Sequence, residues 1–462
     1  MNTKNFLIIS ILLLSTTVFS QNFTGKALDE NREDSACAIM WKVIEKSPFH
    51  LAKVLKQERD NRKFKSTDII FGGRTSGDST KVYFKYDGLI WAVPNYSFVD
   101  GFWLGQSVEL GIKRNENSLW KITPSAYWTT ARKTWVWDVD MSLTYSPLKL
   151  GKVSLSAGSR TDDYNYLNGT MPIGNALYSL FFGINDSRFY ENNFLKINNE
   201  IDITNGLNLT LGLTFAKRNP LQNHTTYSFW GNPENAKPNI PTYNKNLNAH
   251  FTGLNRYSME LKYTPAYYFS IEKGKKRYVK SRYPTFTLSY NQGVTGLMTH
   301  SSNFSSLEGT ISQRVPLGIF DQLIYEVGGG GFLNKNSFNY IDYKHFNSAY
   351  DMFTTKTSES SYALLDYYSY STHKYWEQVF VTYQARYLLL KRLPFLQGKI
   401  FNESLHVRFL YTPDKPYYYE WGYSIGVPML GSVGVFTSFD SFKHSNWRVG
   451  LSLEFLQLFG LN

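Results

Sequence analysis

The feature that most constrains this chain is an alternation of apolar and polar residues with a period of two, from about residue 67 onward. Between Leu207 and Phe215, every second residue is Leu or Phe, with Asn, Thr, Gly and Thr between them. Trp447–Phe455 repeats the design with Arg, Gly, Ser and Glu in the alternate positions. Because successive side chains of a β-strand point to opposite faces, the pattern predicts an all-β fold. Its sheet has one apolar face and one face of small, polar and charged residues.

A soluble antiparallel sandwich shows the same alternation, so the composition has to decide between the two. Phe, Tyr and Trp make up 17% of the 462 residues, which is typical of the aromatic girdles of a membrane barrel. The density of Gly, Ser, Asn, Thr and charged residues on the polar face is typical of a lumen. We therefore predict a transmembrane antiparallel up-and-down β-barrel, closed because an open edge in lipid leaves backbone groups unpaired. A soluble sandwich or solenoid with an aromatic ligand surface is the alternative.

The pattern predicts about 16 strands, an even number as in bacterial outer-membrane barrels. The segments are 102–113, 118–129, 133–146, 152–160, 176–185, 194–204, 207–216, 254–272, 282–292, 304–315, 319–332, 375–390, 399–411, 417–427, 430–440 and 445–456.

The connections between these segments support the count. The tight turns Asn205–Gly206, Pro316–Gly318 and Pro428–Met429 are all even-numbered, and Asn-Gly is a strong hairpin signal. The two longest connections, 217–253 and 333–374, are the seventh and the eleventh. Long extracellular loops and short periplasmic turns are the asymmetry expected of an outer-membrane barrel. Residues 161–174 are the exception, since they are too long for the periplasmic turn that the count assigns to them.

The N-terminus predicts export. Lys4 precedes an apolar run from Phe6 to Phe19, and Val18 and Ser20 fit a signal-peptidase site, so residues 1–20 are predicted to be a signal peptide. Residues 21–66 form a short helical or irregular periplasmic or plug segment, and residues 67–462 form the barrel. A single cysteine, Cys37, excludes an intrachain disulfide.

Export also limits the partners. The predicted location is the outer membrane of a Gram-negative bacterium, where nucleic acid is not a partner. The net charge of +12 favours an acidic neighbour such as lipopolysaccharide. We also expect the barrel-assembly machinery to bind the last strand and an unknown periplasmic partner to exist. The assembly signal consists of Trp447, Val449, Leu451, Leu453 and Phe455.

Two groups of candidate site residues follow from this topology. Charged residues on the predicted lumen face have mixed signs, which favours internal ion pairs over a selectivity ring of one sign. They are Glu109, Glu200, Asp202, Arg386, Arg408, Glu420 and Arg448. Aromatic residues in the two long loops are candidates for recognition: Tyr227, Trp230, Tyr340 and Tyr343.

The sequence predicts no enzyme. The eight histidines show no metal-ligand spacing on a helix, and no Gly-x-Ser-x-Gly motif occurs. Glu200 and Asp202, two residues apart, fit a solvated lumen wall better than a paired-carboxylate site. We therefore expect no catalytic residue, no metal site and no cofactor.

Four stretches carry a resemblance to a known family: Ile69–Gly73 (IIFGG), Val99–Gly105 (VDGFWLG), Leu364–Thr372 (LLDYYSYST) and Lys391–Leu396 (KRLPFL). The chain resembles an uncharacterised outer-membrane β-barrel family of Bacteroidetes, usually found behind a carboxypeptidase-regulatory-like domain. Residues 21–66 are too few for that domain. The resemblance implies an outer-membrane barrel from about Thr67 to Phe455.

The strand number also makes the chain distantly similar to the sixteen-stranded insertase and two-partner secretion barrels. Those barrels carry periplasmic repeat domains, for which we see no room here. They also carry an Arg-Gly-aromatic motif in a late extracellular loop that folds into the lumen, and residues 333–374 lack it. We expect a non-enzymatic barrel in envelope biogenesis or transport. The alternatives are a passive diffusion pore and an insertase or translocase-like barrel, and an outer-membrane lipase or protease fits less well.

Overall fold

A computed structural model describes residues 68–452 of the chain, with gaps at 76–80, 116–117, 166–171, 241–252, 273, 297–300, 319, 338, 349–352, 355–359, 395–400, 428–430 and 442. The predicted signal peptide, the segment 21–66 with Cys37, and Leu453 and Phe455 of the assembly signal lie outside the described residues. No helix in the described ranges is both long and apolar enough to cross a membrane.

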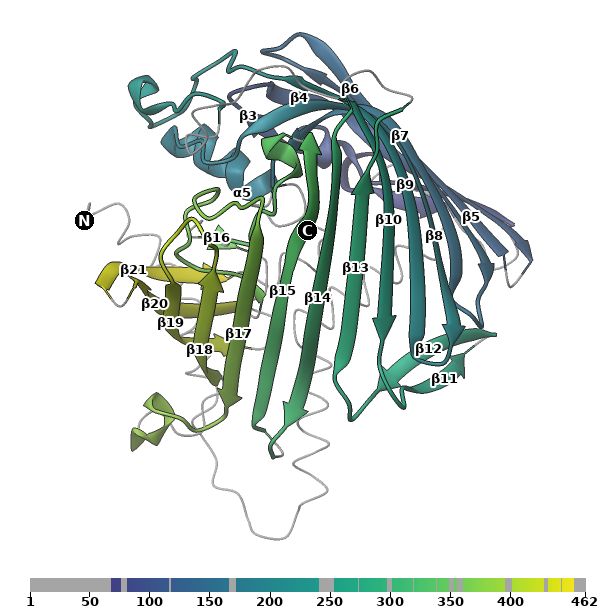
Figure 1. Ribbon diagram of the computed structural model, residues 1–462. Coiled ribbons are helices and arrows are strands. Elements are labelled where there is room, and N and C mark those ends of the chain that lie inside the picture. Colours follow the sequence, from purple (N-terminus) through teal and green to yellow (C-terminus); the bar gives the residue numbers. More distant parts are fainter. Residues whose placement is uncertain are drawn as a thin grey trace, which may run out of the picture. The chain divides into compact units, whose positions relative to one another are not determined.

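The described residues are mostly β-strand (Figure 1). The strands are β1 (Gly73–Thr75), β2 (Val82–Tyr86), β3 (Tyr96–Ser97), β4 (Gly101–Asn115), β5 (Ser118–Thr129), β6 (Thr134–Ser146), β7 (Gly151–Asp163), β8 (Phe189–Thr204), β9 (Leu207–Pro220), β10 (Gly253–Tyr263), β11 (Tyr268–Glu272), β12 (Lys275–Lys280), β13 (Thr285–Gly293), β14 (Asn303–Pro316), β15 (Gln322–Ser337), β16 (Phe353–Thr354), β17 (Tyr375–Ala385), β18 (Asn402–Tyr411), β19 (Tyr418–Val427), β20 (Gly431–Asp440) and β21 (Lys443–Ser452). The short helices are α4 (Asp68–Phe71), η1 (Leu89–Trp91), α5 (Pro172–Leu177), the π-helical turn η2 (Tyr178–Phe182), η3 (Pro233–Asn235), η4 (Tyr340–Asp342) and η6 (Leu390–Arg392).

Nineteen strands form one sheet, and β11 and β12 form a separate hairpin. The long strands of the 19-stranded sheet follow one another in an antiparallel up-and-down order, from β2 next to β4 through to β20 next to β21. The all-β antiparallel architecture predicted from the sequence is therefore confirmed. Among the described residues, β21 pairs on its second side with β16, in parallel at Phe353–Leu451, and not with β1 or β2.

The number of long strands agrees with the prediction, but one member differs. Sixteen strands of the large sheet have five or more residues: β2, β4 to β10, β13 to β15 and β17 to β21. The predicted strand 176–185 was wrong, because these residues lie in α5, η2 and the loop after them, and β7 pairs directly with β8. Its place in the count is taken by β2, which the sequence analysis missed. The predicted strand 254–272 is in fact β10 and β11, with a turn between them.

The helical conformation at 172–182 has local causes that period-two reasoning overlooks. Pro172 is the first residue of α5, where a missing N–H costs nothing, and Gly183 ends η2 with φ 71°, a left-handed cap that suits glycine. Ala176 and Leu180, one helical turn apart, pack against Tyr96 and Phe98. Helical spacing thus buries Ala176 and partly buries Leu180, which the alternation assigned to a strand.

The loss of the predicted strand 176–185 and the gain of β2 cancel in the strand count. The connections from β8 onward therefore keep the numbers that the sequence analysis gave them. The turns 205–206, 317–321 and 428–430 remain even-numbered, and the long connections 221–252 and 338–374 remain odd-numbered. Residues 164–188 now form one odd-numbered connection, so the overlong periplasmic turn disappears. We call the end of the sheet that carries the even-numbered connections the even rim, and the opposite end the odd rim.

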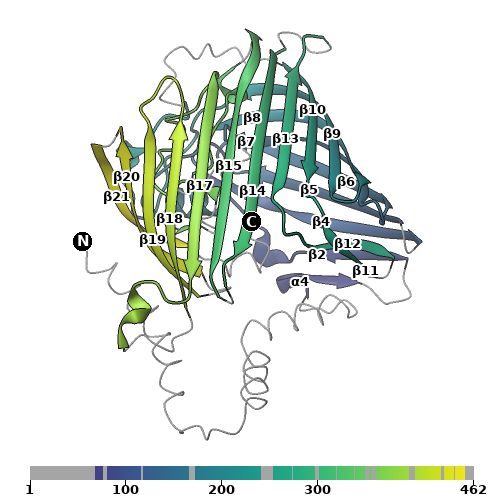
Figure 2. The same ribbon diagram turned by 60° about the horizontal axis from the view of Figure 1, so that its bottom comes forward.

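The sheet is curled, because one short segment reaches strands that are far apart in it. Tyr368 donates to Asp163 at the end of β7 over 2.8 Å, and Tyr370 donates to Asp440 at the end of β20 over 3.0 Å. Ten successive pairings separate β7 from β20, which in a flat sheet corresponds to roughly 48 Å. Two residues of extended chain span only about 7 Å. Figures 1 and 2 show the curvature directly.

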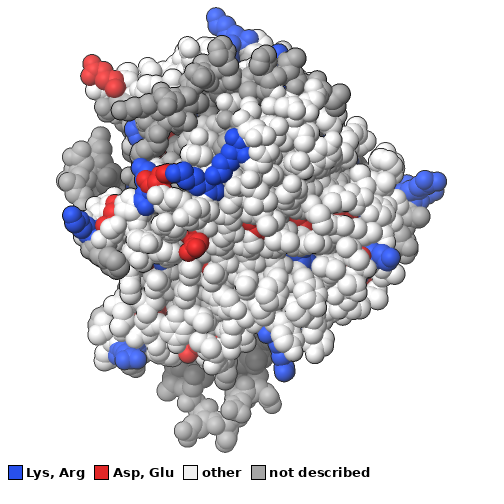
Figure 3. Space-filling view, in the orientation of Figure 1, with Lys and Arg blue, Asp and Glu red and all other residues white. Residues whose placement is uncertain are grey.

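The burial of the two faces is the reverse of that in a soluble sheet. The apolar side chains of the long strands are exposed, among them Trp447 (65%), Trp421 (57%) and Leu288 (47%). Polar residues on the other face, such as Glu420 and Thr382, are buried. In Figure 3, Lys, Arg, Asp and Glu are sparse on the face that the view presents. The curled sheet therefore encloses its polar face and presents its apolar face outward.

Candidate functional site

The inner face of β17–β20 carries charged side chains that are almost completely buried. Strand register places Phe380, Arg408, Glu420 and Ser438 side by side on four neighbouring strands. Since directly opposed residues share a face, the four side chains point to the inside together. The alternation of β18 and β19 seen in the sequence is what sets this row.

Arg408 and Glu420 form an ion pair within this row. Arg408 Nη1 lies 2.8 Å from Glu420 Oε2, and their side chains are 2% and 0% exposed. Tyr418 also donates to Glu420 Oε1 over 2.6 Å. Removing two charges from water costs several kcal/mol per ion, so such a pair persists only where further hydrogen bonds satisfy it.

Those further hydrogen bonds come from the eleventh connection, 338–374. The backbone N–H groups of Ala363 and Leu364 donate to Glu420 Oε2 and Oε1, both over 2.7 Å. The Tyr362 hydroxyl donates to the Phe409 carbonyl oxygen over 2.8 Å. Residues 360–374 of this connection are therefore folded onto the inner face and held by a strand carboxylate. We call residues 360–372 the in-folded segment.

An apolar cluster seals the in-folded segment against the strands. Its buried members are Phe346, Tyr362, Leu365, Tyr370, Trp376, Phe380, Leu410 and Tyr418. Leu410 was the one apolar residue on the polar face of its strand in the sequence, and the cluster explains it. An apolar side chain on a lumen face was thus a sequence signal for a segment packed inside, which the sequence analysis did not use.

The beginning of the same connection is fixed to a different part of the sheet, at β9. Asp342 Oδ1 lies 2.6 Å from Arg218 Nη1 of β9, with both side chains buried, and Asp342 Oδ2 accepts from the Ser302 hydroxyl over 2.7 Å. Arg218 and these hydrogen bonds keep the pKa of Asp342 below its usual value, despite the opposing effect of burial. The sequence offered no pattern for this pair, because its members are 124 residues apart.

His345 belongs to the same anchor. Its ring is buried, with Nε2 3.1 Å from the Tyr340 carbonyl oxygen and Nδ1 2.7 Å from the Ser371 hydroxyl. A carbonyl only accepts, so Nε2 carries the proton. Burial lowers the pKa of His345 to about 4, so the ring is neutral at neutral pH. The ring connects the two ends of the eleventh connection.

The other predicted lumen charges lie apart from this row. Glu109 pairs with Lys121 at 2.8 Å and accepts from Tyr83. Glu200 is exposed near the even rim, whereas Asp202 is buried there and pairs with Lys276 at 2.9 Å. Arg386 lies after the end of β17, above the Phe320 ring.

Arg448 lies on β21, opposite Phe436 of β20. Of the predicted lumen charges, the structure brings together only Arg408 and Glu420 as an ion pair. The mixed signs of the predicted charges therefore indicated ion pairing but did not identify most of the partners.

The predicted recognition aromatics divide into two kinds. Trp230 is 75% exposed and Tyr227 is also exposed, next to Phe181, Phe182 and Phe229. Tyr340 is buried in a tyrosine cluster, and Tyr343 packs on that cluster. Tyr340 therefore offers no contact surface in this conformation, and recognition by these loops would fall to Tyr227 and Trp230.

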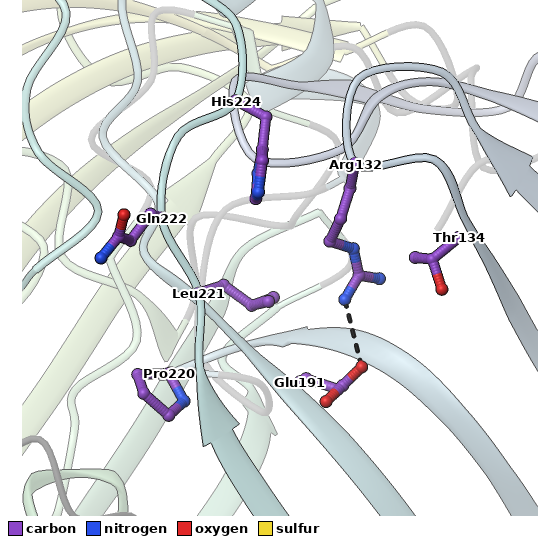
Figure 4. Close-up of a pocket in the computed structure, with 7 residues that line it drawn as sticks. All are labelled: Arg132, Thr134, Glu191, Pro220, Leu221, Gln222 and His224. Atoms are coloured by element: carbon purple, nitrogen blue, oxygen red, sulfur yellow. Dashed lines mark hydrogen bonds and ion pairs between the residues drawn. The ribbon is translucent and has the colours of Figure 1, made fainter.

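A shallow pocket of about 390 Å³ opens at the odd rim (Figure 4). Its lining residues are Arg132, Thr134, Glu191, Pro220, Leu221, Gln222 and His224. The Arg132 guanidinium already pairs with Asp100 at 2.8 Å and with Glu191 at 3.3 Å. A neutralised guanidinium attracts an anion weakly, so the in-folded segment is the stronger candidate site. Across the described ranges, no group of His, Cys, Asp and Glu is arranged to hold a metal ion.

Comparison with known proteins identifies the family. Residues 67–425 match the model described as "Family of unknown function (DUF5686) C-terminal domain". The chain belongs to this family. The match includes all four stretches that carried the sequence resemblance, and it contains β18, the in-folded segment and Glu420. The buried site is thus part of the DUF5686 C-terminal domain.

Similarity to solved structures is remote. Variants of a Rhodopseudomonas blastica porin match with 8% identity and a TM-score of 0.31, covering 76% of this chain and 90% of the porin. CdiB from Acinetobacter baumannii matches with 9% identity and a TM-score of 0.37, covering 81% of this chain and 56% of CdiB. No curated protein matches the chain.

Proposed function

We propose that this DUF5686 C-terminal domain protein is a non-enzymatic outer-membrane β-barrel of a Gram-negative bacterium that acts in envelope biogenesis or transport. One observation carries the proposal: the large sheet exposes its apolar face and buries its polar face. In water, so many exposed apolar side chains on one continuous surface are unfavourable, whereas in lipid they are the expected exterior. Each long strand from β4 to β20 also pairs with a neighbour on both sides, and the bilayer interior requires such pairing of backbone groups.

The resemblance to a Bacteroidetes barrel family supports the same proposal and suggests that group as the source. Lipopolysaccharide outside, the barrel-assembly machinery and a periplasmic partner are the partners that we propose. The sequence contains no Gly-x-Ser-x-Gly motif and no metal-ligand spacing of histidines on a helix, and we therefore propose no enzyme.

An insertase or translocase-like barrel is the second candidate, and the in-folded segment favours it over a passive diffusion pore. A late connection of the strand meander lies inside, held by Glu420, although it lacks the Arg-Gly-aromatic motif. A segment fixed by a buried ion pair and an apolar cluster obstructs the lumen more than a mobile constriction loop does. A pore would conduct steadily in a planar bilayer, whereas an obstructed barrel would conduct little until the segment moves.

The experiment that tests membrane insertion is heat-modifiability. The chain is purified from the outer-membrane fraction and run on a gel in mild detergent with and without boiling. A folded barrel migrates differently from its boiled form, and we expect that shift. If the chain instead partitions into the soluble periplasm and shows no shift, the sheet is a soluble fold and the proposal is overturned.

A further inference from the structure

Two even-numbered connections are longer than the expected short turn: residues 386–401, which contain η6, and residues 264–284. Residues 264–284, between β10 and β13, contain the separate hairpin of β11 and β12. Figures 1 and 2 both show this hairpin at the even-rim ends of the strands around β8 to β10. A sheet needs no such element to connect two neighbouring strands, so the hairpin calls for an explanation of its own.

The hairpin is fixed across two neighbouring turns of the even rim. Lys276 Nζ and the Tyr278 hydroxyl contact Asp202 Oδ2 at 2.9 Å and 2.7 Å. The Gly206 N–H donates to the Tyr278 hydroxyl over 2.7 Å, and the Lys276 N–H donates to the Pro147 carbonyl oxygen over 3.2 Å. The buried Asp202 carboxylate is thus used to hold the hairpin against the β6–β7 and β8–β9 turns. A hairpin anchored in this way keeps its exposed side chains in a fixed position relative to the even rim.

The exposed side chains of the hairpin, which lie on both of its faces, are cationic and apolar. Lys275 and Lys280 are exposed and form no ion pair with another described residue, and exposed Lys149 lies on the neighbouring β6–β7 connection. Apolar side chains stand out beside these cations: Tyr268 (61%), Ile271 (59%) and Val279 (62%). Glu272 is the hairpin's only acidic residue, and it lies 3.7 Å from Arg277. The charge on this surface is therefore almost uncompensated.

We propose that the β11–β12 hairpin binds anionic phospholipid headgroups of the bilayer leaflet at the even rim. The inference rests on the proposed membrane insertion, because the rim lies at headgroup level only if the long strands span the bilayer. Lysines attract lipid phosphates, while neighbouring aromatic and aliphatic side chains enter the interface. An acidic protein would match the cations alone and would leave the three apolar side chains unexplained.

The test uses the full chain with its single cysteine removed (Cys37→Ala) and a fluorophore sensitive to polarity attached at Val279→Cys. The protein is refolded into nanodiscs of phosphatidylcholine, with or without phosphatidylglycerol. We expect a blue shift and protection from an aqueous quencher in the anionic discs, both weakened by salt. The triple variant Lys275→Gln, Arg277→Gln, Lys280→Gln should lose both effects.

A matched control removes the same charge at the odd rim, with Lys133→Gln, Lys217→Gln and Lys443→Gln, and should keep both effects. Heat-modifiability of each sample separates two kinds of failure. Two outcomes would overturn the hairpin inference but leave the proposed function standing. In the first, the chain inserts but the label stays in water in both lipids. In the second, the label is protected only by added periplasmic protein. If the chain inserts into neither disc, the proposed function fails and this inference fails with it.

Discussion

At the scale of single residues, the site depends on one carboxylate with four hydrogen-bond donors. Glu420 accepts from Arg408, Tyr418 and the backbone of Ala363 and Leu364. Two of these donors belong to the strands and two to the in-folded segment, so the same side chain serves the sheet and the connection. A buried ion pair adds little net stability by itself. Its consequence here is the specific position of a segment inside the sheet.

Replacement of that carboxylate should release the segment. Glu420→Gln keeps the shape but removes the charge that compensates Arg408, and its amide group presents a donor where donors already converge. Breaking one partner of a buried pair costs about 3–5 kcal/mol. We expect higher conductance in a planar bilayer and faster proteolysis within 360–372. Glu109→Gln, which disrupts a partly exposed pair elsewhere, should cost no more than about 1 kcal/mol. Equal conductance of both variants would contradict a role for Glu420 in holding the segment.

The neutral ring of His345 predicts a dependence on pH. The pKa of this buried ring is lowered from 6.5 to about 4, an effect of burial and of Lys344 that Asp342 and the Tyr340 carbonyl oppose. Between these two values the released ring binds a proton that the docked ring does not, so docking weakens as pH falls through that window. Above about pH 6.5 the full stability is present. Hydrogen exchange at 339–348, corrected for the intrinsic exchange rate at each pH, should rise with acid in the wild type and stay flat in His345→Gln. An identical acid response in the variant would rule out His345 as the cause.

At the scale of elements, the difference between 176–185 and β2 shows what decides whether an apolar stretch becomes a strand. Residues 172–182 have a proline at the start, a left-handed glycine at the end and a partner surface at helical spacing. Val82–Tyr86 has a longer strand, β4, with an unoccupied edge to pair with. The available partner, more than the propensity of either stretch, determined the outcome.

Whether residues 176–185 form a strand between β7 and β8 can be tested by cross-linking. Ala157 and Leu195 are opposed residues of β7 and β8, so Ala157→Cys with Leu195→Cys, in a Cys37→Ala background, should form a disulfide on mild oxidation. A strand at 176–185 would separate the two positions and prevent the bond. Ala157→Cys with Leu213→Cys, on β9, should not cross-link. Diagonal gel electrophoresis of the oxidised protein distinguishes the cases, and a bond only in the second pair would refute the register.

At the scale of the whole sheet, the exposed apolar surface determines which solvent the protein requires. Leu288 lies on the outer face in the middle of β13, and Ser289, next to it, points to the inside and donates to Glu260 over 3.3 Å. The two positions are adjacent in sequence but lie in different environments. They therefore make a matched pair for a single charged substitution.

An arginine should distinguish the two faces. In a bilayer, Leu288→Arg should lower the free energy of unfolding by about 2–4 kcal/mol. Ser289→Arg can pair with Glu260 and should be tolerated. Urea titrations of the reconstituted protein, read by gel shift, measure both effects. In a soluble protein the order would be reversed, because an exposed leucine accepts arginine and a half-buried serine does not. Tolerance of Leu288→Arg would therefore argue against membrane insertion.

The sequence by itself determined the class of the sheet, the segregation of its faces and most strand positions. These depend on alternation and on turn residues such as Asn205–Gly206, which act over a few residues and are visible in the chain. It also predicted charged pairing inside, and both Arg408 and Glu420 were among the candidates.

Only the tertiary structure decided which charges pair, that residues 360–374 lie against the inner face, and that the connection between β10 and β13 carries a basic hairpin. Arg218 and Asp342, or Tyr370 and Asp440, are far apart in sequence and meet only because the sheet curls. Curling depends on the summed twist and pairing of many strands, and no local pattern encodes which distant residues it brings together.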